Sequence, residues 1–124
     1  MAIPRIDKEA LKERLDSGGP DAPVVVDVRL KYPYEHSSVR IPGAVRVEPP
    51  GFDCSTLPKD RDIVTYDSDP NELVGAQVAA RLIRGGYRAS TLKGGIVEWL
   101  TAQFPTEEKS APTQKPPKAG ALKG

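Results

Sequence analysis

Short apolar runs rich in β-branched residues mark the strands of this chain. "APVVVDV" at residues 22–28 and "RDIVTYD" at 61–67 are the clearest runs, and a shorter one lies around residues 44–47. Runs that are continuously apolar, rather than alternating, are typical of strands buried on both faces of a parallel sheet. The pattern therefore predicts a mostly parallel sheet.

Segments with helical spacing separate these strands. Residues 73–84 carry apolar side chains three and four positions apart and run into a pair of glycines, which predicts a helix and its end. Asp7 is the expected N-cap of an earlier helix. Residues 87–95 predict a short strand and a glycine turn, and residues 96–104 predict a final short helix.

Alternating strands and helices predict a small α/β domain, whose ligands bind beyond the carboxyl ends of the strands. The loop that follows the strand at residues 62–66 is one of these ends. It carries acidic residues and no lysine, arginine, histidine or cysteine. We expect it to be a binding loop, made of Asp67, Ser68, Asp69, Pro70, Asn71, Glu72 and Leu73.

Composition and net charge narrow the classes of function that this protein could have. The chain has 124 residues, enough for one domain, and a formal net charge of +1, which gives no broad field to attract nucleic acid or a membrane surface. No apolar run approaches the roughly 20 residues that span a bilayer, and the N-terminus shows no apolar leader. We therefore expect a cytoplasmic protein with no nucleic-acid or membrane partner. Residues 106–124, rich in Pro and Lys, predict a flexible tail behind a domain at residues 1–105.

Cysteine and histidine offer little chemistry. Cys54 is the only cysteine, so it can form neither an internal disulfide nor a cysteine-based metal cluster. His36 is the only histidine and lies in a polar segment. We interpret both as ordinary loop or surface residues, and we expect no metal and no cofactor.

Four segments occur in a characteristic order: "VVVDVR" at 24–29, "RIPGAVRV" at 40–47, "DIVTYD" at 62–67 and "AARLIRGGYRASTLKGG" at 79–95, followed by Trp99. Together they resemble the rhodanese-like domain over roughly residues 3 to 105. The resemblance implies a three-layer α/β/α fold with a five-stranded sheet, and relatives that move sulfane sulfur through a cysteine persulfide. It also implies that Asp27 and Arg29 form a structural ion pair near the site.

This chain departs from the family pattern at the catalytic position itself. In the family, the catalytic cysteine directly follows the strand that matches "DIVTY", and here that position is Asp67. The Pro-Asn-Glu that often ends the catalytic stretch of relatives is retained at residues 70–72. A second departure is Val39-Arg40, where the family usually has Gly-His.

The acidic loop admits three interpretations. Asp67, Asp69 and Asn71 have the spacing of a calcium-binding EF-hand loop, but Glu72 and Val78 occupy positions that need glycine and glutamate. Asp67 could act as a nucleophile or a general acid–base, although no partner set is recognisable. In the third interpretation, Asp67 is itself the anion held by the backbone N–H groups of the loop. It would then cap the following helix with a lowered pKa.

Two functions follow from these alternatives. A carboxylate forms no persulfide and repels an anionic substrate, which favours a non-catalytic binding or regulatory module with an unknown protein or small-molecule partner. The alternative is a thiosulfate or persulfide sulfurtransferase whose native cysteine is replaced by Asp67, or one that uses Cys54.

Overall fold

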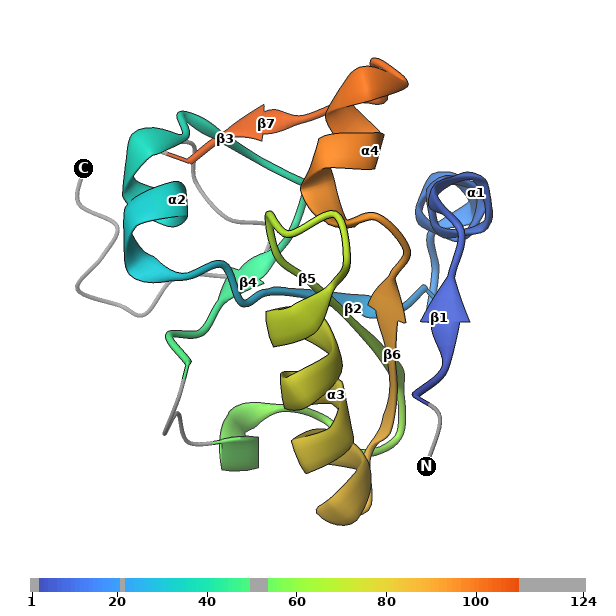
Figure 1. The fold of residues 1–124 in the computed structure, drawn as a ribbon. Coiled ribbons are helices and arrows are strands. Elements are labelled where there is room, and N and C mark those ends of the chain that lie inside the picture. The colour runs from blue at the N-terminus through green and yellow to red at the C-terminus, as the bar shows by residue number, and fades with distance from the viewer. Residues whose placement is uncertain (1–2, 21, 50–53, 110–124) are drawn as a thin grey trace, which may run out of the picture.

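The structure is a computed structural model that describes residues 3–20, 22–49 and 54–109. Figure 1 shows its arrangement. In chain order the elements are β1 (Arg5–Ile6), α1 (Lys8–Ser17), β2 (Val24–Asp27), α2 (Lys31–His36), β3 (Val39–Arg40), β4 (Val45–Arg46), the 3-10 turn η1 (Cys54–Thr56), β5 (Asp62–Tyr66), α3 (Leu73–Arg84), β6 (Arg88–Leu92), α4 (Gly95–Thr101) and β7 (Glu107–Glu108).

Five strands form one parallel sheet in the order β1-β6-β5-β2-β4. The two central pairings place β5 between β2 and β6, with Asp27 opposite Tyr66 and Asp62 opposite Arg88. The carboxyl ends of β2 and β5 therefore meet at the same edge of the sheet. The loop that follows β5 starts at this edge (Figure 1).

The sheet separates two apolar cores. One face buries Val25 and Val64 against Leu11 of α1 and against Ile96 and Trp99 of α4. The opposite face holds a second core, which combines strand residues, buried α3 side chains and residues of the connecting segments. Its members are Val26, Val28, Leu57, Ile63, Val78, Ala79, Leu82, Tyr87 and Ala89. Because neighbouring strand residues point to opposite faces, a continuously apolar strand supplies both cores. The expected three-layer α/β/α fold with a five-stranded sheet is confirmed.

The long elements follow the sequence pattern, whereas strands β1, β3 and β7 and helix α2 were not predicted. The helix expected at residues 73–84 is α3, and the strands expected at 22–28 and 61–67 are β2 and β5. The two-residue strands β1, β3 and β7 are too short to show any periodicity. Helix α2 has no buried residue and contains Pro33, so it shows no apolar stripe. Proline is tolerated there because the first turn of a helix has no N–H partner to lose.

The domain extends past the boundary expected at residue 105. Strand β7 pairs with β3 in a small antiparallel sheet, and Lys109 donates its backbone N–H to the Ser38 carbonyl at 3.0 Å. The side chain of Glu107 pairs with Arg40 at 2.5 Å. Residues 106–109 are therefore part of the domain, and the rest of the expected tail, residues 110–124, lies outside the described residues. No helix of the described chain is long and apolar enough to cross a membrane.

Candidate functional site

Asp67 follows the last residue of β5, and its carboxylate turns back into the loop. Its Oδ1 accepts the Asp69 backbone N–H at 3.1 Å, and its Oδ2 accepts the Gly75 N–H at 2.7 Å. Gly75 is the third residue of α3, so the second bond satisfies an N–H that has no partner inside the helix. The residue at the N-cap position, Glu72, makes no side-chain capping bond. Asp67 therefore caps α3 from outside the usual capping position.

The loop is held by its own turns. Asp69 accepts the Glu72 N–H on its carbonyl oxygen and the Asn71 N–H on its carboxylate, both at 2.9 Å. Glu72 adopts a left-handed conformation with φ of 56°, which reverses the chain into α3. Ser68 is half-buried, whereas Pro70, Asn71 and Leu73 are exposed. The loop thus presents Pro70, Asn71 and Leu73 outward and keeps Asp67 inside.

Helix α4 closes over the inner side of the loop. The Ile96 N–H donates to the Asp67 carbonyl oxygen at 2.9 Å. Gly95 has φ of 65°, and a Cβ at this position would lie 2.6 Å from that same oxygen. This contact requires glycine for two reasons, the left-handed backbone and the close approach. It also explains why Asp67 is only 2% exposed.

The pKa of Asp67 differs from the sequence expectation. Burial raises the pKa of the Asp67 carboxyl above its ordinary value, although the backbone N–H groups of Gly75, Asp69 and Val74 act in the opposite direction. The prediction of a lowered pKa was wrong. The first cause of the raised pKa is desolvation of a carboxylate that is nevertheless well hydrogen-bonded.

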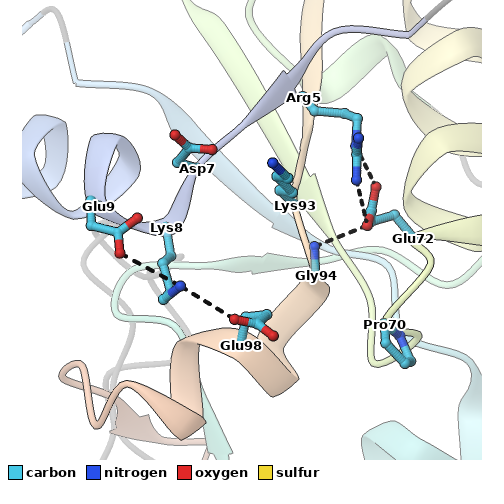
Figure 2. Close-up of a pocket in the computed structure, with 9 residues that line it drawn as sticks. All are labelled: Arg5, Asp7, Lys8, Glu9, Pro70, Glu72, Lys93, Gly94 and Glu98. Carbon is cyan, nitrogen blue, oxygen red and sulfur yellow. Dashed lines mark hydrogen bonds and ion pairs between the residues drawn. The ribbon is translucent and has the colours of Figure 1, made fainter.

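The carboxylate of Glu72 pairs with residues outside the loop. Its carboxylate pairs with Arg5 of β1 at 2.7 Å and accepts the Gly94 N–H at 3.0 Å, as Figure 2 shows. Burial opposes ionisation of Glu72, but the bonds from Arg5 and Gly94 outweigh it and lower the pKa. Glu72 therefore ties the loop to β1 and to the turn that precedes α4.

A cavity of about 440 Å³ lies beside the contacts of Glu72 with Arg5 and Gly94. Lys8 lies within 3.2 Å of Glu98 and 3.5 Å of Glu9, so part of the cavity wall is a set of paired charges (Figure 2). The lining residues are Arg5, Asp7, Lys8, Glu9, Pro70, Glu72, Lys93, Gly94 and Glu98. Sequence reasoning missed the contributions of β1 and α1, because nothing in their local pattern shows that the edge strand β1 brings Arg5 to a loop 67 positions away.

Asp27 and Arg29 form a buried ion pair at the end of β2. Arg29 Nη2 and Nε donate to the Asp27 carboxylate at 2.7 and 3.0 Å, and both side chains are at most 2% exposed. Arg29 also donates to the Val39 carbonyl oxygen. Since Asp27 lies opposite Tyr66 in the sheet, this pair sits beside the start of the Asp67 loop.

The remaining candidate residues lie elsewhere. His36 ends α2 and is exposed, and Cys54 begins η1. Among the residues that the structure describes, no group of three or more His, Cys, Asp or Glu side chains is placed to hold a metal ion. The EF-hand spacing of Asp67, Asp69 and Asn71 therefore does not bring such a group together here.

Comparison with known proteins identifies the family. The model of the rhodanese-like domain matches residues 7–102. A crystal structure of a protein from Anabaena is 32% identical with a TM-score of 0.65, covering 82% of this chain and 81% of its own. The solution structure of the rhodanese-like domain of an Anabaena protein is 29% identical with a TM-score of 0.69, covering 95% and 90%.

A Bacillus halodurans protein shares the fold at 24% identity, with a TM-score of 0.73 and coverage of 91% of this chain and 85% of its own. No curated protein matches the sequence. The family match extends over most of the chain and includes β2, the Asp67 loop and α3. This chain therefore belongs to the rhodanese-like domain family.

Proposed function

We propose that this rhodanese-like domain does not transfer sulfur and serves as a binding or regulatory module. The observation that carries the proposal is the Asp67 carboxylate, which accepts the N–H groups of Asp69 and Gly75. In sulfur transfer, a thiolate attacks the sulfane sulfur and becomes a persulfide. A carboxylate is not thiophilic, and its two oxygens already occupy the N–H donors that would stabilise an anion.

The proposed binding surface is the carboxyl edge of the sheet. It combines the outer side of the loop, where Leu73 is 61% exposed, with the mixed-charge cavity that contains Pro70 and Glu72. Paired charges of both signs suit a polar protein segment or a small polar molecule better than a simple anion. The partner class supported here is therefore a protein or a small molecule.

A second candidate is a sulfurtransferase whose native cysteine is replaced by Asp67. The surroundings of position 67 favour this candidate, because the Gly75 N–H points at the side chain of residue 67 and Gly95 approaches its carbonyl oxygen closely. The Asp67→Cys variant would place a thiol at the N-terminus of α3, where backbone donors and the helix dipole lower a thiol pKa.

Sulfur transfer from thiosulfate to cyanide tests both candidates. The sulfane sulfur of thiosulfate would pass to the thiolate with sulfite leaving, and cyanide would then remove it as thiocyanate. We expect the unmodified chain to match a heat-denatured control, and the Asp67→Cys variant to produce thiocyanate. Turnover by the unmodified chain that disappears in Cys54→Ser would overturn the non-catalytic assignment. An inactive but folded Asp67→Cys variant would count against the replaced-cysteine alternative.

A further inference from the structure

Another cavity, which no residue of the Asp67 loop lines, lies between β4, α2 and the end of β2. Its volume is about 150 Å³, and α2 and the β3–β7 pair stand on the side of the molecule opposite β1 and α1 (Figure 1). At about 30 Å³ per water molecule, this space holds a group of a few heavy atoms and excludes a nucleotide. The lining residues are Asp27, Tyr34, Arg40, Gly43, Ala44, Val45 and Arg46.

Positive charge exceeds negative charge around this cavity. The carboxylate of Asp27 is bonded to Arg29 at 2.7 Å and lies 3.6 Å from Arg46, so two guanidinium groups share one acid. Glu107 pairs with Arg40. Lys109 donates to the Tyr34 carbonyl oxygen, and no carboxylate of the described chain forms an ion pair with it.

The cluster therefore has four cations, Arg29, Arg40, Arg46 and Lys109, and two acids, Asp27 and Glu107. Counted over these six side chains, the excess is two positive charges, against a formal net charge of +1 for the whole chain.

Three of these cations lie close to the ring of Tyr34. Arg46 lies 4.0 Å from the ring centroid, Lys109 lies 3.9 Å from it, and Arg29 lies 5.3 Å from it. The negative face of an aromatic ring attracts a cation but carries no net charge. The three cations therefore still repel one another, and an anion bound beside them would relieve this repulsion.

Arg46 is the donor best placed to receive such an anion. Its Nη1 donates to the carbonyl oxygens of Arg29 at 2.5 Å and Asp27 at 3.4 Å, which fixes the guanidinium group. Within the described chain, no residue accepts a hydrogen bond from its Nε or Nη2. The side chain is 20% exposed, so solvent reaches it. A fixed guanidinium with unused donors matches the geometry of an oxyanion.

We propose that this cavity binds a compact oxyanion of the phosphate class, with Arg46 as the principal hydrogen-bond donor. Lys109 supplies further positive charge, and the ring of Tyr34 lies next to both Arg46 and Lys109. None of the lining residues belongs to the Asp67 loop, and the proposal does not depend on whether the domain transfers sulfur. The alternative is that the cluster only joins α2, β4 and the β3–β7 pair.

The test is a titration of the full chain with inorganic phosphate, followed by amide NMR, with sodium chloride at equal ionic strength as the reference. We expect saturable shifts of the Gly43 to Val47 amides with phosphate and none with chloride. Arg46→Gln should weaken phosphate binding at least about tenfold, the size expected when one charged hydrogen-bond pair is lost. Arg88→Gln is the matched control, because Arg88 is 59% exposed and pairs with Asp62 at the other end of the strands.

Three results would overturn the proposal. The first is the absence of saturable shifts in the unmodified chain, and the second is equal weakening by Arg46→Gln and Arg88→Gln. The third is a set of shifts confined to the Asp67 loop. If Arg46→Gln does not fold, Lys109→Gln replaces it and should weaken phosphate binding several-fold, because it removes one excess charge. Unchanged affinity in that variant would also contradict the proposal.

Discussion

Replacement of Asp27 by asparagine tests whether the ion pair at the end of β2 is a structural support of the site. The substitution keeps the shape of the side chain and removes its charge. Arg29 would stay buried and would keep its hydrogen bond to the Val39 carbonyl oxygen. Its second acceptor would be the amide oxygen of the new side chain instead of a carboxylate. Arg46, which lies 3.6 Å from the same carboxylate, would lose its nearest acid as well.

The expected loss in the free energy of unfolding follows from the burial of Arg29. Removing one partner of a buried ion pair costs about 3 to 5 kcal/mol, because the other charge remains buried and uncompensated. Arg29 retains the Val39 carbonyl and the faces of Tyr34 and Tyr66, at 5.3 and 5.5 Å from their ring centroids, so we expect the lower end of this range. For a domain of this size, about 3 kcal/mol corresponds to a loss of roughly 10 to 20 °C in Tm.

Urea denaturation monitored by fluorescence of Trp99, the only tryptophan and a buried residue, measures this cost. Asp62→Asn is the matched control. Asp62 also contacts two arginines, Arg14 at 3.0 Å and Arg88 at 2.8 Å, but its side chain is 40% exposed. An exposed pair contributes about 0 to 1 kcal/mol. The two variants therefore make the same chemical change beside two arginines and differ mainly in burial.

A free-energy loss for Asp27→Asn no larger than that for Asp62→Asn would refute the reasoning. It would mean that water reaches Arg29 or that the cavity beside it adjusts to compensate the charge. A loss of activity or binding without loss of stability would instead assign Asp27 a direct role in the site.

Because burial raises the pKa of Asp67, the folded protein holds this proton more tightly than the unfolded chain, whose carboxyl titrates near 3.9. The free energy of unfolding of the unmodified chain, compared with that of Asp67→Asn, should therefore fall as pH rises from about 4 through the folded pKa. A difference in favour of the unmodified chain that grows with pH would contradict this prediction. Gly95→Ala should lower the free energy of unfolding by about 1 to 3 kcal/mol more than Gly19→Ala. Both glycines have positive φ, but only at Gly95 would a Cβ meet a backbone oxygen. Equal losses measured by denaturation would argue against the close contact. Deleting residues 110–124 should change stability by no more than about 0.5 kcal/mol, whereas deleting 106–124 should cost about 2 kcal/mol more by removing the Glu107 partner of Arg40. Equal denaturation midpoints for the two truncations would show that β7 does not support the domain.

The sequence pattern alone determined the long elements and the strand-to-helix junction that forms the candidate site. A β-branched run buried on both faces can only be a central strand of a covered sheet, and the spacing of Val78, Ala79 and Leu82 gives one buried helix face. The strand-to-helix junction at Asp67 followed from these two elements. An acid at that junction can accept the free N–H groups of the helix, whatever surrounds it.

Only the tertiary structure decided the properties that depend on distant segments. The pKa of Asp67 is set by its burial under α4, and the position of Glu72 is set by Arg5 on an edge strand. Strands β3 and β7 are two residues long, so their pairing has no local signature. Desolvation and long-range ion pairing arise from neighbours brought together by folding, whereas helical and strand periodicity repeat along the chain itself. For this reason local patterns pointed to the candidate site, and tertiary packing set the direction in which the pKa of Asp67 is shifted.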